Sequence, residues 1–348
     1  MDIDPILNNW MAGKPPTPGD YDRLEQFALA DCDRAIAFNL TSEILSIQIP
    51  QQARLFPTLA AQLPHLIPAA LPQIAYRTLW QVWFPLAWQI IADRQHLDRP
   101  LVQGILGSQG MGKTTLCRIL SLICTELGYS CASLSLDDLY KTYGDRQQLK
   151  QQDPRLSHRG PPGTHDIQLG IDALQACRDS QYPVAFPRFD KSAYGGEGER
   201  TTAESIEPAD IIFFEGWFVG VRPIAPETFD RAPSPIATES DRQFAREMNE
   251  RLQDYLPLWD CLDRLTILYP TDYRLSKQWR QQAEREAIAR GKSGMSDADI
   301  DGFVDYFWRT LHPELFITPL AQNSDIADLV IEINRDRSLG RIYRPHPS

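Results

Sequence analysis

The sequence has few cysteines, and their spacing suggests neither a disulfide framework nor a metal site. The 348 residues include six cysteines, and no two of them form a CxxC pair. We therefore expect buried, free thiols in a reducing compartment. Cys117 and Cys124 lie seven residues apart in a probable helix, which places both on one face, a core face. No His, Cys, Asp and Glu cluster has zinc spacing, and no Ser-His-Asp or Cys-His arrangement is supported.

Long apolar runs and targeting signals are also missing. The N-terminal residues begin with acids and contain no basic n-region, so we expect no signal peptide. The most apolar stretch, residues 79–92, contains Pro85 and is shorter than the ~20 residues that a membrane-spanning helix needs. We expect a soluble, cytoplasmic protein that does not bind a membrane.

Basic residues are in the minority. The chain has 35 Lys and Arg against 46 Asp and Glu, a formal net charge of −11. This balance disfavours nucleic-acid binding, which usually depends on a basic face. Basic side chains are nevertheless concentrated in residues 273–292 and 334–348, so the chain can still offer local cations to an anionic small molecule. The length suits two domains, or one α/β domain with an extension.

Residues 19–98 have the spacing of helices. Apolar residues recur every three to four positions from Asp20, a candidate N-cap, to residue 45, and predict one helix. Residues 75–92 are apolar nearly all round and predict a second, buried helix. The intervening stretch predicts short turns, because it contains Pro57, Pro64, Pro68 and Pro72. We expect residues 1–98 to form a helical extension that packs on the rest of the chain and has no chemical role.

From residue 101 the pattern changes to short apolar runs that alternate with helical spacing. This alternation predicts βαβ units and a mostly parallel sheet with helices on both faces. The predicted strands are residues 101–106, 130–136, 183–186, 211–214, 264–268 and 329–333. Ligands of such sheets bind at the carboxyl ends of the strands, so those ends are where we look for chemistry.

A phosphate-binding loop follows the first predicted strand. Residues 107–114, GSQGMGKT, fit G-x-x-x-x-G-K-[ST] between a strand and an amphipathic helix. Its glycines allow positive φ and bring backbone N–H groups around phosphate oxygens. Lys113 is placed to bind the β- and γ-phosphates, and the hydroxyl of Thr114 to bind Mg²⁺. The sequence therefore predicts a site for a nucleoside triphosphate.

Carboxylates follow two other predicted strands. Asp137 and Asp138 end the run SLSL, and one of them is a candidate general base for a substrate hydroxyl. The alternative is that an Asp there only caps a helix. Glu215 ends the run IIFF and is a candidate Mg²⁺ ligand, directly or through water. Gly216 behind it leaves room for that ligand.

Three further segments offer substrate or phosphate contacts. Arg159 and His165 lie in a polar loop, although a lone histidine is more often a helix cap or a surface residue. Arg188 and Lys191 follow the third predicted strand and suit a small carboxylate substrate. Residues 273–285 form a basic helix that can close over a triphosphate and supply an arginine. A solvated helix face with Arg280 paired to Glu284 is the alternative.

These segments, in this order, resemble the phosphoribulokinase/uridine kinase branch of P-loop kinases. Within that branch they are most similar to the plant and cyanobacterial type of glycerate 3-kinase. The resemblance covers about residues 98–340. The segments RGPPGTHD (159–166) and FPRFDKS (186–192) point to glycerate rather than to uridine, pantothenate or ribulose 5-phosphate. The other matching segments are GSQGMGKTT (107–115), SLSLDDLY (133–140), IIFFEGWFVG (211–220) and WRQQAERE (279–286).

The resemblance implies a three-layer α/β P-loop fold over residues 99–348, with a lid around residues 273–292. It implies transfer of the γ-phosphoryl group of ATP to the 3-hydroxyl of D-glycerate, with Mg²⁺. Other hydroxyl acceptors, and a nucleotide-dependent switch NTPase, remain alternatives.

The implied site residues fall into four groups. The catalytic group is Asp137, or its neighbour Asp138, with Lys113 and Arg280. The metal group is Thr114 and Glu215. The substrate group is Asp137, Arg159, His165, Arg188 and Lys191, of which Arg159, Arg188 and Lys191 are chosen by their charge rather than by a family motif. The nucleotide group is Gly107, Ser108, Gln109, Gly110, Met111, Gly112, Lys113, Thr114 and Thr115.

Overall fold

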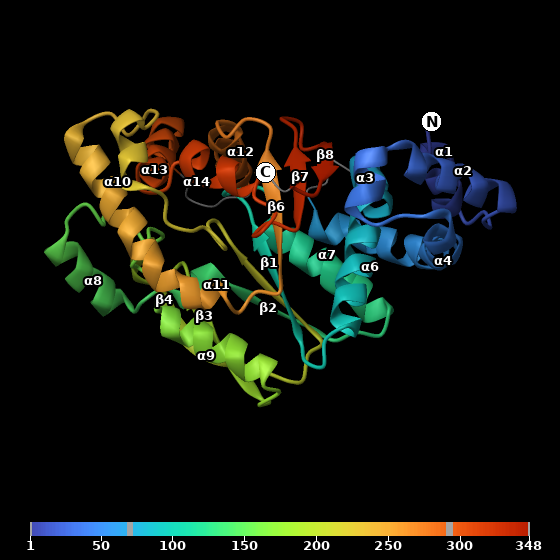
Figure 1. The fold of residues 1–348 in the computed structure, drawn as a ribbon, viewed down its shortest axis with the longest axis horizontal. Coiled ribbons are helices and arrows are strands. Elements are labelled where there is room, and N and C mark those ends of the chain that lie inside the picture. Colours follow the sequence, from blue (N-terminus) through green and yellow to red (C-terminus); the bar gives the residue numbers. More distant parts are fainter. Residues whose placement is uncertain (1, 68–71, 290–294, 347–348) are drawn as a thin grey trace.

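The computed structural model describes residues 2–67, 72–289 and 295–346, built around a six-stranded sheet (Figure 1). The strand order is β2-β5-β1-β6-β7-β8, and every neighbouring pair is parallel except β7 and β8. The predicted α/β fold with a mostly parallel central sheet is confirmed. The strands are β1 (Leu101–Leu106), β2 (Cys131–Ser135), β5 (Ile211–Gly216), β6 (Arg264–Pro270), β7 (Leu329–Ile333) and β8 (Leu339–Tyr343).

Alternating side chains of the central strands bury opposite faces of the sheet, which produces three layers. Ile105 and Phe213 pack with α7 (Lys113–Glu126) and the N-terminal helices. Leu106 and Phe214 pack on the other face, which is covered by α9 (Ile167–Arg178), α10 (Glu239–Arg251), α11 (Leu256–Trp259) and α14 (Pro313–Leu320).

Four of the six cysteines are buried, as expected, Cys131 is partly buried, and the reducing compartment stays a prediction. Cys117 and Cys124 are both buried on α7, and all six thiols are free. Cys32, however, is exposed. It is the first residue of α3 (Cys32–Ala37), in a short helix with few buried positions.

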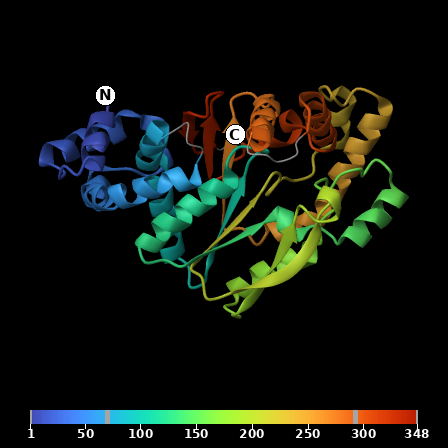
Figure 2. The ribbon, with the colours of Figure 1, turned by 180° about the vertical axis from the view of Figure 1, so that it is seen from behind.

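One predicted strand lies outside the central sheet. The run at 183–186 belongs to β3 (Val184–Asp190), which pairs only with β4 (Glu199–Ile206) in an antiparallel hairpin. The sequence carries the reason, since Pro187 sits at a bulge in β3 and charged residues follow it. A strand that is buried on both faces needs a nearly continuous apolar run. Figure 2 shows this hairpin beside α9, away from the N-terminal helices.

The N-terminal helices differ from the prediction in their boundaries. The expected helix from Asp20 to residue 45 is three helices, α2 (Pro18–Ala30), α3 and the start of α4 (Ser42–Leu66). Thr17 caps α2, and Asp20, the third residue of the helix, completes its capping box. The chain breaks after α2 because the Asp31 side chain accepts a hydrogen bond from the backbone N–H of Arg34 and starts a new helix.

Three prolines lie within α4 instead of ending it, so the predicted turns at Pro57 and Pro64 are wrong. Pro50, Pro57 and Pro64 repeat every seven residues, on the more exposed side of the helix. The opposite side buries Ile49, Phe56 and their neighbours, and this packing outweighs the lost backbone hydrogen bonds. Pro68 lies outside the described residues, and Pro72 begins α5 (Pro72–Thr78).

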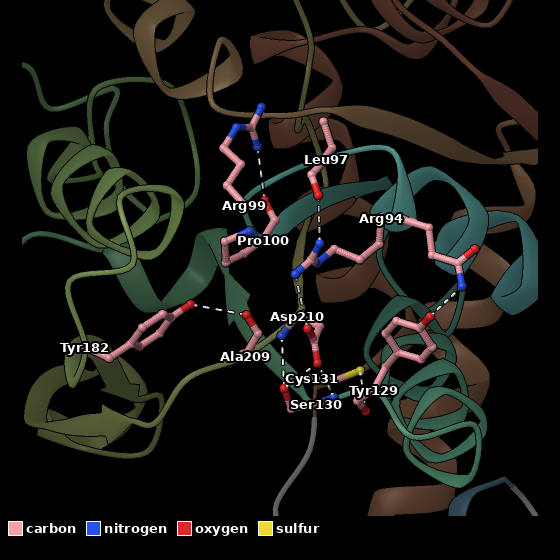
Figure 3. Close-up of polar contacts among 11 residues, drawn as sticks. Arg94, Leu97, Arg99, Pro100, Tyr129, Ser130, Cys131, Tyr182, Ala209 and Asp210 are labelled. Atoms are coloured by element: carbon pink, nitrogen blue, oxygen red, sulfur yellow. Dashed lines mark hydrogen bonds and ion pairs between the residues drawn. The ribbon is translucent and has the colours of Figure 1, made fainter.

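The second predicted helix is present as α5, a π-helical turn at Leu79–Trp83 and α6 (Phe84–Gln95). The end of α6 is tied to the sheet by polar contacts (Figure 3). An Arg94 guanidinium nitrogen lies 3.2 Å from Asp210 Oδ1, and Asp210 Oδ2 accepts hydrogen bonds from the backbone and hydroxyl of Ser130. Ser130 and Asp210 precede β2 and β5, so these contacts join the helical extension to the N-terminal ends of two strands. That residues 1–98 and 99–348 are separate units stays a prediction.

Three further helices lie near the carboxyl ends of the strands: α8 (Tyr143–Gln152), α12 (Leu275–Ala289) and α13 (Asp297–Thr310). The first helix, α1 (Asp4–Met11), lies with the other N-terminal helices, away from these ends. Among the described helices, none is both long and apolar enough to span a membrane.

Candidate active site

In the loop between β1 and α7, two of the three glycines adopt the predicted positive φ, and Gly107 does not. Gly110 and Gly112 have φ of 77° and 84°, a conformation that glycine adopts without strain. Lys113 is the first residue of α7, and its Nζ donates to the carbonyl of Ser108 at 3.2 Å. The free N–H groups and the dipole of the helix N-terminus therefore face the same space as the lysine.

The pairing of β1 with β5 places a carboxylate beside this loop. Ile105 pairs with Glu215 in the parallel register, so Glu215, the second-last residue of β5, lies next to the end of β1. The Thr114 hydroxyl donates to Glu215 Oε1 at 2.8 Å, and Lys113 Nζ lies 4.0 Å from Oε2. Two oxygen ligands suited to a hard cation thus lie together beside a phosphate-binding lysine.

Asp137 reaches the same edge from the other side of β5. Ser135, at the end of β2, pairs with Glu215, and Asp137 follows in a 3₁₀ turn (Leu136–Leu139). Its Oδ1 accepts from the Tyr140 hydroxyl at 2.8 Å. Its Oδ2 accepts from Lys191 Nζ at 2.6 Å. The strand order β2-β5-β1 therefore brings Asp137, Glu215 and the phosphate-binding loop together.

Asp138 has a different environment from its neighbour. It accepts from the backbone N–H of Ser135 in a capping box and pairs with Arg188 at 3.1 Å. Burial raises the pKa of Asp138, while the N–H of Ser135 and the charge of Arg188 partly oppose the rise. Asp138 therefore fits the alternative of an acid that caps a helical turn. Asp137 lines the cavity and fits the alternative of a general base.

A cavity of about 820 Å³ joins these groups. Predicted residues in its lining are Gln109, Gly110, Lys113, Thr114, Asp137, Arg159, Lys191, Glu215 and Arg280. Predicted residues that its lining does not include are Gly107, Ser108, Met111, Gly112, Thr115, His165 and Arg188. The residues of this second set that belong to the phosphate-binding loop support the loop backbone without lining the cavity. For example, Met111 Sδ accepts a hydrogen bond from the backbone N–H of Ser108.

Two of the predicted substrate residues lie away from the cavity for physical reasons. Arg188 bonds Asp138, Glu204 and a backbone carbonyl, so its charge is already neutralised. His165 is 1% exposed and stacks on Tyr140 at a ring-centroid distance of 4.7 Å. Burial lowers the pKa of His165 to about 3. Because the ring stays neutral, it supports Tyr140 from behind rather than offering a cation to a substrate.

Sequence reasoning missed the aromatic residues of the cavity. Tyr140, Trp217, Phe303 and Phe307 all line it. Phe303 and Phe307 lie four residues apart on α13, a spacing more typical of a helix core than of a ligand site. Tyr140 had a weak signal, since it lies two residues after the paired acids.

The C-terminal basic segment reaches the phosphate-binding loop. Arg337, in the turn between β7 and β8, donates to the carbonyl of Gly110 at 2.7 Å. Its guanidinium also lies 5.3 Å from the ring of Trp279 on α12. Local cations therefore surround this loop although the chain as a whole is acidic.

The predicted lid coincides with α12, but residues 290–292 of that prediction lie outside the described residues. Arg280 is paired with Glu284 at 3.1 Å, as the alternative interpretation expects. Arg280 also lines the cavity, and its Nε is buried without a hydrogen-bond partner among the described residues. Arg280 thus combines the helix-surface pair with a position over the cavity.

Comparison with known proteins relates this geometry to P-loop kinases. The kinase mug58 of Schizosaccharomyces pombe, described as uncharacterized, is 33% identical over 223 residues, covering 60% of this chain and 79% of the relative. The chain belongs to this family of P-loop kinases. The family includes the chloroplastic D-glycerate 3-kinase of Arabidopsis thaliana, 30% identical over 69% of this chain. No family model matches the sequence.

A solved structure supports the same assignment. The D-glycerate 3-kinase of Cryptococcus neoformans has a TM-score of 0.67 and 25% identity, over 75% of this chain and 98% of that one. The chain spans 54% of the length of the Arabidopsis kinase.

The buried His165 predicts a pH dependence of stability. Its pKa of about 3 in the folded protein lies below its ordinary value of 6.5, so the unfolded chain binds more protons between these values. The free energy of unfolding therefore falls as pH is lowered through this window. Between pH 7 and pH 4 we expect the free energy of unfolding, measured with urea, to fall by about 2–3 kcal/mol less in His165→Asn than in the unmodified protein. An equal loss in both proteins would contradict this role of the histidine.

Proposed function

We propose that the protein is an ATP-dependent kinase that transfers the γ-phosphoryl group to the 3-hydroxyl of D-glycerate and forms 3-phosphoglycerate. The observation that carries the proposal is the convergence of Lys113, the Thr114–Glu215 pair and Asp137 on one cavity. A kinase needs those three functions within a few ångströms of the transferred phosphoryl group. The cations of the cavity and the names of two relatives support glycerate as the acceptor.

The nucleotide would bind through its phosphates at residues 107–115. Lys113 would leave the Ser108 carbonyl to bind the β- and γ-phosphates. Gln109 Oε1 and Arg280 Nε are buried in or beside the cavity without hydrogen-bond partners among the described residues. Such atoms are costly to leave unsatisfied, which supports a polar ligand here and a role for Arg280 near the phosphates.

The residues present fit Mg²⁺. Among the described residues, no group of three or more His, Cys, Asp or Glu side chains forms a protein-only metal site. Mg²⁺ in kinases instead takes one or two protein oxygens together with phosphates and water, and Thr114 and Glu215 supply such a pair. When bound, the ion would neutralise charge on the β- and γ-phosphates.

Asp137 is the proposed general base. The acceptor hydroxyl would donate its proton to the carboxylate while its oxygen bonds to the γ-phosphorus, and the bond to the bridging oxygen of ADP breaks. Lys191 and Arg159 are the proposed partners of the acceptor carboxylate, since both line the cavity with Asp137. Arg159 is held at the rim by the carbonyl of Gly196.

An acceptor screen tests this function. We expect ADP release from ATP and Mg²⁺ to rise well above background with D-glycerate, and not with pantothenate, uridine or ribulose 5-phosphate. Product analysis should give 3-phosphoglycerate. Turnover with another of these acceptors would keep the kinase and replace the acceptor. ATP hydrolysis that no acceptor changes, with a protein partner bound tightly, would favour a nucleotide-dependent switch.

The neighbouring acids offer a matched pair of variants. Asp137→Asn should lower kcat by about 10²–10⁴, the usual range for a lost general base, with little change in the KM for ATP. Asp138→Asn should instead reduce thermal stability, because Asp138 bonds the backbone of its turn and Arg188. A normal kcat in Asp137→Asn together with a large loss in folded Asp138→Asn would reverse the assignment.

A further inference from the structure

Asp137 has both of its carboxylate oxygens engaged by other side chains. Lys191 Nζ lies 2.6 Å from Oδ2, and the Tyr140 hydroxyl lies 2.8 Å from Oδ1. Tyr140 is 5% exposed and stacks on the buried ring of His165, so its contact is fixed by packing. The contact with Lys191 is therefore the one that can change.

Lys191 differs from the other cations near the paired acids in how firmly it is held. Its side chain is 58% exposed, and it follows β3 in the hairpin that lies outside the central sheet. Arg188, in contrast, bonds two carboxylates and the Ser133 carbonyl with a side chain that is 25% exposed. Because the lysine side of the ion pair is exposed, an anion can reach Lys191 from solvent and compete with Asp137 for it.

The Asp137–Lys191 pair opposes the function of a base. An ammonium at Oδ2 occupies the position from which a hydroxyl would donate its proton, and it stabilises the ionised carboxylate. Burial favours the neutral acid, but the charge and hydrogen bond of Lys191, with the Tyr140 hydrogen bond, outweigh it and lower the pKa of Asp137. A carboxylate in this state is a weak proton acceptor.

We propose that Lys191 keeps Asp137 from acting as a base until the anionic group of the acceptor binds Lys191 and breaks the ion pair. The inference rests on the proposed kinase function and adds to it. The acceptor's anion then does more than hold the substrate in place, because it also releases the base. Uncharged alcohols and water cannot do so, and the pair selects against both.

The ion pair between Lys191 and Asp137 prevents a competing reaction, the hydrolysis of ATP by water. Without it, the oxygen of a water molecule would bond to the γ-phosphorus, and the bond from that phosphorus to the bridging oxygen would break. ADP would leave with the electron pair, and Asp137 would take a proton of the water. The products are ADP and inorganic phosphate, so ATP would be consumed without phosphorylation of the acceptor.

The test measures ATP hydrolysis by the full chain with ATP and Mg²⁺ and no acceptor. In Lys191→Ala we expect hydrolysis to rise by about tenfold or more, within the range that a general base supplies, while D-glycerate phosphorylation falls. The double variant Lys191→Ala/Asp137→Asn should return hydrolysis to the level of the unmodified protein.

Lys14→Ala is the matched control. Lys14 is exposed and lies far from the cavity, and the contact that the structure gives for its side chain is a hydrogen bond to Asn9. Lys14→Ala should change neither the rate of ATP hydrolysis nor the rate of D-glycerate phosphorylation. Unchanged hydrolysis in Lys191→Ala that still binds ATP would overturn the proposal, and so would a rise that persists in the double variant. Phosphorylation of D-glycerate by the unmodified protein tests the proposed function separately, because the hydrolysis assay contains no acceptor.

Discussion

The pairing of β5 with β1 on one side and with β2 on the other determines where the groups of the site lie. In parallel strands the carboxyl ends meet at one edge of the sheet. The register sets Glu215 opposite Ile105 and Ser135, so the phosphate-binding loop, Glu215 and Asp137 leave three adjacent strands at the same level. The hydrophobic layers on both faces keep this register, since a slip by one residue would turn buried side chains to the wrong face.

Ion pairs between neighbouring groups balance the charges of the site. Lys113 lies near Glu215, Lys191 contacts Asp137, and Arg188 contacts Asp138. The first two pairs line the cavity, where a triphosphate and an anionic acceptor would compete with the carboxylates for the two lysines. The net charge of −11 is thus compatible with binding anions, because the local cations and backbone N–H groups matter more than the average charge.

Much of the fold and part of the site could be predicted from the sequence. The phosphate-binding loop and the apolar central strands were clear because both depend on local residue patterns. The hairpin β3–β4 and the course of α4 were not, because pairing of β3 with the polar strand β4, outside the central sheet, and packing of one helix face outweigh local signals such as Pro57. His165 and Arg188 illustrate the same limit at the site, since their charge in the sequence did not show that one is buried and neutral and the other already paired.

The most direct test of the central claim is a crystal structure of the protein with D-glycerate, Mg²⁺ and a non-hydrolysable ATP analogue. The account predicts the phosphates on the loop at residues 107–115 and the 3-hydroxyl of glycerate within about 2.6–3.2 Å of a carboxylate oxygen of Asp137. Lys191 should contact the glycerate carboxylate instead of Asp137. Glycerate bound elsewhere, or with its 3-hydroxyl directed away from Asp137, would contradict it.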